Sequence, residues 1–291
     1  MRLVTFSHDG ATRLGAVRTT NGRQTVVDLH SVEPRSPSDM LAFLEGGEET
    51  LGLAREALNR APSAADLDLS AVTLKAPIPN PSKIICIGLN YRDHAAESQQ
   101  EVPAYPTVFA KYPSCLVGSG AAIVLPRISS QVDYEGELAV VIGRRARQVA
   151  EADALSYVGG YAPFNDVSVR DYQMRTSQWT IGKTFDTHGP MGPALVTADE
   201  VPDPQALNIR VSIGDEALQS ANTAQMIFPV AHLIAYLSAV MTLEPGDIIA
   251  TGTPSGVGAA RTPPRFLRPG ETVRVEIEGL GVLENPVVAQ T

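Results

Sequence analysis

The chain has 291 residues, of which 44% are hydrophobic and 19% charged, and its formal net charge is -9. This length and composition suffice for one large domain, or for a large domain with a small one, and they exclude a disordered chain. The acidic balance excludes a nucleic-acid partner, because phosphate binding needs a basic surface.

The N-terminus and the two cysteines bear on location. "MRLVTFSHDG" lacks the apolar core of a secretory signal, and no stretch approaches the roughly 20 apolar residues that span a membrane. Cys86 lies in an expected buried strand and Cys115 in a loop, so neither indicates a disulfide framework or a thiolate zinc site. We therefore expect a cytoplasmic protein without a membrane partner.

Residues 1–75 contain short alternating segments, "RLVTFS", "RLGAVRT" and "QTVVDLH", separated by turn signals. "SPSDMLAFLEGG", capped by Ser38, and "EETLGLAREALNRA" predict helices. The three prolines of "APIPNPSK", residues 76–83, predict a domain boundary. The sequence thus predicts a small β-rich N-terminal domain over residues 1–75 and a larger domain over residues 76–291.

Strands predominate from Lys83 onward. The predicted strands are "KIICIG", "TVFAKY", "ELAVVIG", "ALVTA", "NIRVSIG", "DIIATG" and "TVRVEIEG". "MIFPVAHLIAYLSAVMTLEPGD" predicts a helix closed by Pro245 and Gly246. Because strands outnumber helices and do not alternate with them regularly, the pattern favours a mainly β fold with some α, a mixed β roll or sandwich, over a doubly wound or barrel α/β fold.

The stretch "DYEGEL" places carboxylates at three alternate positions, Asp133, Glu135 and Glu137. In a β-strand these side chains would share one face. A solvated strand face is the ordinary interpretation, but three adjacent like charges oppose one another. A divalent cation such as Mg²⁺ removes that conflict and leaves positions for water and substrate. We therefore expect Glu135 and Glu137 to bind one ion with a third carboxylate from elsewhere.

Asp166, in "YAPFNDVSVRDYQ", is a candidate for that third carboxylate, although Asn165 and Asp166 also fit a turn or a helix cap. Lys183 lies in the otherwise apolar "WTIGKTFDTHGPMGP". Its "GKT" lacks the first glycine of a P-loop, so a phosphate cradle is rejected.

The segment "NYRDHAAESQQEVP" follows a predicted strand and places His94 and Glu97 three residues apart. On a short helix capped by Asn90 or Asp93 they would share one face. A carboxylate beside an imidazole raises its basicity, which suits a general base for water, whereas an exposed surface helix is the alternative. "TGTPSGVG", residues 251–258, is a tight turn whose hydroxyl and N–H groups suit a carboxylate.

Together and in order, these segments resemble the fumarylacetoacetate hydrolase family: "GLNYRDHAAE", "DYEGELAVVIG", "GGYAPFNDVSVRDYQ", "IGKTFD", "GPMGP", "LEPGDIIATGTPSGVG" and "FLRPGE". The resemblance covers roughly Lys83 to Asn285. It implies a mixed β roll, often dimeric, with a small N-terminal domain in many members. It further implies that Glu135, Glu137 and Asp166 bind one Mg²⁺ or Mn²⁺ and that His94 with Glu97 activates water on a mobile lid.

The resemblance also assigns substrate contacts to Arg170, Gln173, Thr253 and Lys183, the last as a catalytic group that stabilises an enolate. Asp133 occupies an acidic position of the family pattern without a ligand role. "FAKYPS", with Tyr112 after Lys, departs from the family pattern and leaves the acyl group open.

The reaction implied by the resemblance is metal-dependent hydrolysis of a C–C bond in a β-diketo acid, an acylpyruvate or fumarylpyruvate of aromatic catabolism, to pyruvate and a carboxylic acid. Decarboxylation of oxaloacetate, or isomerisation of a 2-hydroxymuconate-type acid, uses the same chemistry and stays open. A non-catalytic β-sandwich binding module would leave His94, Glu97 and Lys183 without a task. A serine hydrolase is disfavoured because the chain has no G-x-S-x-G elbow. We expect a homodimer acting on a small 2-oxo or β-diketo acid.

Overall fold

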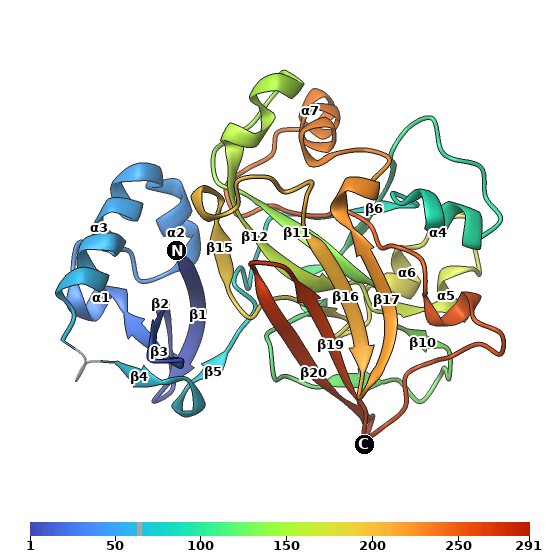
Figure 1. Cartoon of the computed structure of the whole chain (residues 1–291), viewed down its shortest axis with the longest axis horizontal. Helices are drawn as coiled ribbons and strands as arrows, with labels where there is room; N and C mark the ends of the chain where they lie inside the picture. Colours follow the sequence, from blue (N-terminus) through green and yellow to red (C-terminus); the bar gives the residue numbers. More distant parts are fainter. Residues whose placement is uncertain (63–65) are drawn as a thin grey trace.

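The computed structural model in Figure 1 describes residues 1–62 and 66–291. Within them an 11-stranded mixed sheet consists of β1 (Arg2–His8), β2 (Ala11–Thr20), β3 (Arg23–Asp28), β4 (Leu67–Asp68), β5 (Thr73–Leu74), β6 (Ile84–Gly88), β7 (Thr107–Lys111), β11 (Gly136–Ile142), β12 (Val158–Asn165), β15 (Leu195–Thr197) and β18 (Ile248–Ala250). A 5-stranded sheet consists of β9 (Ile123–Leu125), β16 (Asn208–Ile213), β17 (Glu216–Asn222), β19 (Thr272–Ile277) and β20 (Gly281–Ala289).

Short strand pairs and helices complete the fold. The pairs are β10 (Val132–Asp133) with β13 (Ser168–Val169), and β8 (Leu116–Val117) with β14 (Gly189–Pro190). The α-helices are α1 (Leu29–Val32), α2 (Met40–Glu45), α3 (Gly47–Arg60), α4 (Arg92–Glu97), α5 (Arg170–Gln173), α6 (Thr180–Lys183) and α7 (Val230–Val240). None of these helices in the described ranges is long and apolar enough to cross a membrane.

The strand order confirms the predicted fold class, a mainly β protein with some α. The larger sheet runs β4-β3-β2-β1-β15-β12-β11-β18-β6-β7, with β5 also paired to β1, and the smaller runs β17-β16-β19-β20-β9. Parallel pairs such as β18 with β6 occur beside antiparallel pairs such as β11 with β12, so both sheets are mixed. Helices do not alternate with the strands, which agrees with the exclusion of a doubly wound fold.

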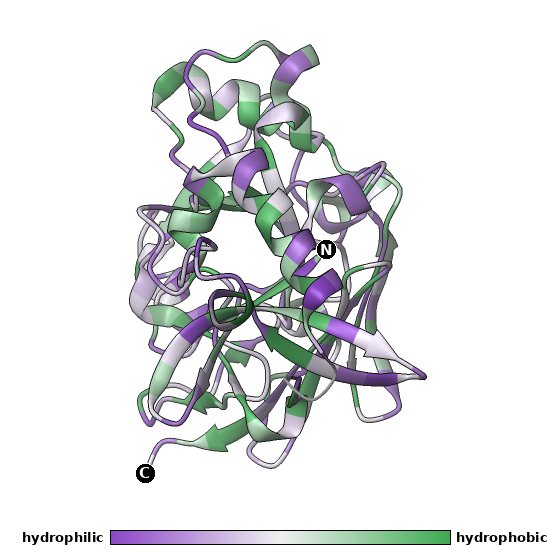
Figure 2. Ribbon diagram, turned by 90° about the vertical axis from the view of Figure 1, so that its left-hand side faces the viewer, coloured by the Kyte–Doolittle hydropathy of each residue, from purple (hydrophilic) through white to green (hydrophobic). Residues whose placement is uncertain are grey.

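The core lies on both faces of the central strands. Every residue of β11 is buried, whereas β19 alternates exposed and buried positions. β11 is therefore covered on both faces, and β19 turns one face to solvent. In Figure 2 the hydrophilic colour is most frequent in outer loops and helices, and the strands carry much of the hydrophobic colour.

The N-terminal segment extends the main sheet. β1 pairs with β15 at Arg2↔Val196 and Leu3↔Leu195, and in Figure 1 the N-terminal strands and α1–α3 lie to one side of the rest. Its core is continuous with that of β11 and β12. The predicted cap of α2 at Ser38 is wrong, since Asp39 accepts the hydrogen bond from Ala42 N at 3.0 Å. The division into domains at residues 75 and 76 stays a prediction.

Four chain segments converge at one edge of the larger sheet. β11 begins where β12 ends, because the antiparallel register joins Gly136 to Asn165. β18 is antiparallel to β11 and parallel to β6, so β18 and β6 end at that same edge. The loop after β18 and the helix α4 after β6 therefore lie beside the first residues of β11. This convergence positions the candidate site.

Candidate active site

Three carboxylates meet at this edge, those of Glu135, Glu137 and Asp166. All three are buried, and one oxygen from each lies within 4.8 Å of the others. One backbone and one side-chain hydrogen bond bring them together: Asp166 N donates to Glu135 O at 2.8 Å, and Glu135 N donates to the Asn165 side-chain oxygen Oδ1 at 3.0 Å. The structure thus assembles the triad that the sequence predicted.

The predicted single row of carboxylates in "DYEGEL" is wrong. Asp133 ends β10 and pairs with Ser168 of β13, whereas β11 begins only at Gly136. Because the chain leaves one sheet for another between these points, strict alternation does not hold across them. Asp133 contacts Arg170 instead of joining Glu137.

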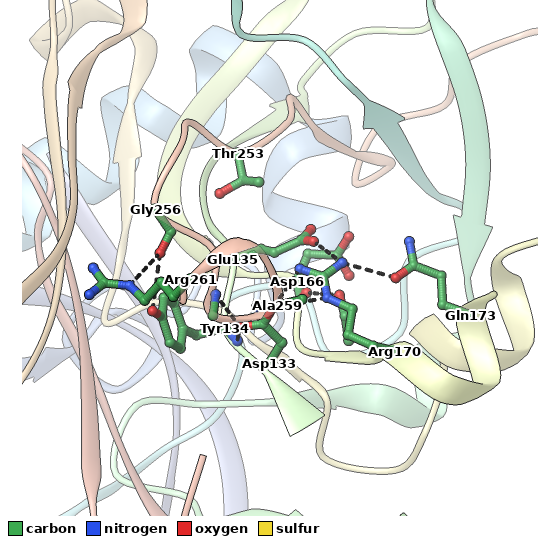
Figure 3. A network of polar contacts seen from close by, with 12 residues as sticks. Asp133, Tyr134, Glu135, Asp166, Arg170, Gln173, Thr253, Gly256, Ala259 and Arg261 are labelled. Atoms are coloured by element: carbon green, nitrogen blue, oxygen red, sulfur yellow. Dashed lines mark hydrogen bonds and ion pairs between the residues drawn. The ribbon is translucent and has the colours of Figure 1, made fainter. Parts of the chain in front are cut away.

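Cations from distant segments balance the triad. Lys183 Nζ lies 2.7 Å from Glu135 Oε2 and 2.8 Å from Asp166 Oδ2. Arg170 Nη1 lies 2.6 Å from Glu135 Oε1 (Figure 3). Lys111 Nζ lies 2.7 Å from Asp166 Oδ1. Three positive charges therefore surround two of the three carboxylates.

Lys111 is a residue that sequence reasoning left without a role. Its side chain is fully buried, and its ammonium also donates to the backbone oxygens of Val167 and Lys183. The signal was its position in "TVFAK", since a period of two places Lys111 on the same inward face as Phe109. A lysine on an inward strand face needs a buried anion as its partner.

The charges divide the triad into two kinds of carboxyl. Burial raises the pKa of Glu135, but the charges of Lys183 and Arg170 outweigh burial and lower it to about 2. Burial and the charges of Asp166 and Glu135 raise the pKa of Glu137 well above its ordinary 4.5. Glu137 accepts only a backbone hydrogen bond of 2.9 Å, from Gly252 N, among its contacts in the described residues. Glu137 therefore keeps its proton to a higher pH than an exposed glutamate does, unless a cation replaces that proton.

This donor set fits a hard divalent ion. Three buried carboxylate oxygens from separate residues match the ligands that Mg²⁺ and Mn²⁺ prefer, and binding would displace the proton of Glu137. Burial lowers the pKa of Lys183, but Asp166 and Glu135 outweigh burial and raise it above its ordinary 10.5. Lys183 therefore stays an ammonium at neutral pH.

His94 and Glu97 share one face of α4, as predicted. His94 Nδ1 lies 3.3 Å from Glu97 Oε2, and Gly256 N donates to both Glu97 oxygens at 2.9 and 3.1 Å. Burial raises the pKa of Glu97, but His94 and Gly256 outweigh it and lower the pKa. The ionised carboxylate favours the proton on His94 Nδ1 and leaves Nε2 as an acceptor. His94 is buried, so α4 is not simply an exposed surface helix.

The predicted caps of α4 hold other contacts. Asn90 Nδ2 donates to Phe228 O at 3.0 Å and to Thr251 O at 2.7 Å, so Asn90 fixes the loop after β18. Asp93 accepts from Ser255 Oγ at 2.7 Å. The N-cap position is Tyr91, so neither residue is the cap, although Asp93 Oδ1 also accepts from His94 N in the first turn at 2.8 Å.

A cavity of about 480 Å³ collects the remaining predicted residues. It is lined by Glu135, Glu137, His94, Glu97, Arg170, Gln173, Lys183 and Thr253, with Phe109, Met174 and Trp179 among its apolar walls. Arg170 Nη1 donates to Gln173 Oε1 at 2.9 Å (Figure 3). Thr253 Oγ1 donates to Gly136 O at 3.0 Å and accepts from Gln219 Nε2 at 2.8 Å. Its only hydroxyl proton is engaged, so Thr253 Oγ1 can only accept a hydrogen bond from a ligand.

The family model described as "Fumarylacetoacetate (FAA) hydrolase C-terminal" matches residues 83–288. The chain belongs to the fumarylacetoacetate hydrolase family. This confirms the family resemblance read from the motifs. The match starts at the strand before α4 and ends in β20, so it includes every residue that lines the cavity.

Relatives within the fumarylacetoacetate hydrolase family carry several activity names. The mitochondrial oxaloacetate tautomerase FAHD2A of Bos taurus is 47% identical, over 99% of this chain and 92% of that protein. Maleylpyruvate hydrolase from Sphingobium sp. SYK-6, solved with manganese(II) and pyruvate, is 33% identical with a TM-score of 0.83 over 100% of both chains. 2-Hydroxyhepta-2,4-diene-1,7-dioate isomerase from Mycobacterium marinum is 35% identical with a TM-score of 0.79, over 100% of this chain and 99% of that one.

Proposed function

We propose that this protein is a metal-dependent enzyme that interconverts the keto and enol forms of an oxaloacetate-type 2-oxo dicarboxylic acid. The observation that carries this proposal is the 47% identity, over 99% of the chain, to a protein named an oxaloacetate tautomerase. The cavity supports it by joining Glu135 and Glu137 of the acid triad to His94 and Glu97. The proposal replaces the C–C hydrolase that the sequence predicted, because the named hydrolase is a more distant relative at 33%.

Keto–enol interconversion moves a proton on or off C3 of the substrate while negative charge develops on the 2-oxygen. From keto to enol, His94, oriented by Glu97, would take the C3 proton while the 2-oxygen gains a proton from solvent; from enol to keto, the O–H proton leaves to solvent and His94 returns a proton to C3. The ammonium of Lys183 would stabilise the charge on the 2-oxygen. Arg170 offers its guanidinium to a substrate carboxylate.

A divalent ion held by Glu135, Glu137 and Asp166 would supply a Lewis acid for the 2-oxo acid end of the substrate. Of the two ions that the sequence favoured, Mg²⁺ or Mn²⁺, the donor set fits both.

Acylpyruvate hydrolysis is the second candidate, and the His94–Glu97 pair favours it. The pair can deprotonate a water, after which hydroxide attacks the distal carbonyl and the C–C bond breaks to release the enolate of pyruvate and a carboxylic acid. Decarboxylation of oxaloacetate needs no activated water, so it depends less on His94. The three reactions are therefore separable by their products and by their need for this pair.

Proton NMR in ²H₂O separates the candidates. A tautomerase accelerates exchange of the C3 protons of oxaloacetate without forming pyruvate, whereas a decarboxylase forms pyruvate and CO₂. A hydrolase leaves oxaloacetate unchanged and cleaves an acylpyruvate, with ¹⁸O from labelled water in the released carboxylic acid. The enzyme is loaded with diamagnetic Mg²⁺, and exchange no faster than in buffer with Mg²⁺ alone would reject the tautomerase proposal.

A homodimer and a cytoplasmic location remain proposals from the sequence. The bovine relative is named as mitochondrial, and that name applies to that protein. Size-exclusion chromatography with light scattering tests the dimer, and imaging of the tagged chain in its own cell tests the location.

A further inference from the structure

Asp133, the first carboxylate of "DYEGEL", is surrounded by hydrogen-bond donors next to the cavity. Its side chain is fully buried. Oδ1 accepts from Tyr134 N and from Gly258 N, each at 2.8 Å. Oδ2 accepts from Ala259 N and from Arg170 Nε, each at 2.9 Å, and Arg170 Nη2 lies 2.8 Å away (Figure 3). A carboxylate with this many donors is rigidly fixed.

Asp133 binds Arg170 on the side that faces away from the cavity. Arg170, Glu135 and Gln173 line the cavity, and Asp133 is not among the described residues that line it. Arg170 thus has two carboxylate partners: Glu135 on the cavity side, through Nη1 at 2.6 Å, and Asp133 on the protein side. Glu135 belongs to the acid triad that would bind the metal, so Asp133 is the carboxylate partner of Arg170 that has no place in the triad.

Asp133 also fixes the turn that carries Glu97's backbone donor. Gly258 and Ala259, which bind Asp133, follow Gly256, which donates to both oxygens of Glu97. The approach at Gly258 is close, since a Cβ there would lie 1.8 Å from Arg265 O and 2.6 Å from Asp133 Oδ1. One carboxylate therefore connects the wall with Arg170 to the wall that supports the His94–Glu97 pair.

We infer that Asp133 is a positioning residue that sets Arg170 and the 256–259 turn for binding of the substrate carboxylate. This role depends on the proposed function only in that the ligand is a 2-oxo acid or a mimic of one. A substitution of Asp133 should therefore lower ligand affinity without lowering metal affinity. The reason is that Asp133 contacts none of the three triad carboxylates in the described residues.

The test is Asp133→Asn, which keeps the shape but turns one acceptor oxygen into a donor. In either orientation the new NH₂ faces two N–H donors, and the ion pair with Arg170 loses its negative charge. Calorimetry with Mn²⁺, and then with oxalate on the Mn²⁺-loaded protein, measures the two affinities separately. We expect the oxalate dissociation constant to rise about tenfold or more, the usual effect of losing charge-assisted hydrogen bonds, with Mn²⁺ affinity unchanged.

Asp247→Asn is the matched control. Asp247 is also fully buried, with Lys83 Nζ at 2.7 Å and a hydrogen bond from Glu244 N at 2.8 Å, and it does not line the cavity. It should lower the melting temperature while leaving oxalate affinity unchanged. Oxalate binding needs no turnover, so failure of the tautomerase proposal and failure of this inference are distinguishable.

The inference is overturned if Asp133→Asn binds oxalate as tightly as the wild type, or if it loses Mn²⁺ and oxalate affinity together.

If Asp133→Asn does not fold, NMR of the arginine Nε–H groups tests whether Asp133 anchors Arg170. The Nε–H signal of Arg170 is the one that is missing from the spectrum of Arg170→Lys. In the wild type this proton should stay protected from exchange with solvent, both without metal and in an oxalate complex loaded with diamagnetic Mg²⁺. Loss of protection in the complex would contradict anchoring by Asp133.

Discussion

Replacing Glu137 with Gln should make the metal-free protein less sensitive to pH, not simply less stable. Glu137 is buried among like charges, and burial with Asp166 and Glu135 raises its pKa above the ordinary 4.5. Between 4.5 and the raised value the folded protein keeps a proton that the unfolded chain has released. The free energy of unfolding therefore falls as pH rises through this window, by at most about 1.4 kcal/mol per pH unit.

The size of this loss follows from the geometry of the triad. Two like charges no more than 4.8 Å apart repel by about 3 kcal/mol or more at an effective dielectric constant of about 20. We therefore expect the wild type to lose about 3 kcal/mol or more relative to Glu137→Gln once Glu137 has ionised, because the amide cannot take up that charge. Saturating Mn²⁺ should abolish the loss in the wild type by neutralising the carboxylates.

Urea unfolding in EDTA, followed by circular dichroism from about pH 5 to about pH 8, measures this difference. Subtraction of the two curves removes the contributions of groups that titrate in both proteins. Parallel curves for the wild type and Glu137→Gln would refute the assignment of a raised pKa to Glu137. If the wild type gained stability relative to the variant as pH rises, the pKa of Glu137 would be lowered in the folded protein instead of raised.

The other predictions concern proton transfer, charge balance and cavity shape. His94→Ala should lower turnover by about 10²–10⁴-fold, and Glu97→Gln should act in the same direction, with Mn²⁺ affinity unchanged by calorimetry; loss of the metal would make His94 a ligand. Lys111→Met should lower the free energy of unfolding, measured in urea, by about 3–5 kcal/mol, because it leaves the buried carboxylate of Asp166 with one partner fewer. An unchanged urea midpoint would contradict a stabilising ion pair between Lys111 and Asp166. Gly88→Ala should raise KM for oxaloacetate, since the new Cβ would lie 2.4 Å from Trp179, and an unchanged KM would show that Trp179 does not shape the bound substrate's space.

The sequence predicted the fold class because β periodicity is a local signal. "ELAVVIG" and "TVRVEIEG" are strands in the structure, with β11 buried on both faces and β19 on one. The order of strands was not predictable from the same signal, since the parallel pairing of β18 with β6 joins segments more than 150 residues apart, as Ile248↔Ile84 shows. Such pairings depend on tertiary packing more than on local propensity.

The sequence predicted the acidic residues of the candidate site but not the basic side chains that pair with them. Glu135, Glu137 and Asp166 meet as expected. The sequence offered no base near "DYEGEL", whereas in space Arg170 lies between Asp133 and Glu135. Ion pairs between residues far apart in sequence leave no spacing pattern, which is also why Lys111 had no role until its contact with Asp166 was seen.

The most direct test of the account follows the loss of the enol absorbance of freshly dissolved oxaloacetate in a stopped-flow instrument. Wild type, Glu137→Gln and EDTA-treated wild type are compared at equal concentration, with Mn²⁺ in buffer as the blank. Mn²⁺-loaded wild type should accelerate the conversion well above the blank, EDTA should remove the acceleration, and added Mn²⁺ should restore it in the wild type but not in Glu137→Gln. Undiminished acceleration by the EDTA-treated wild type, or by Glu137→Gln, would contradict a metal-dependent site built on this triad.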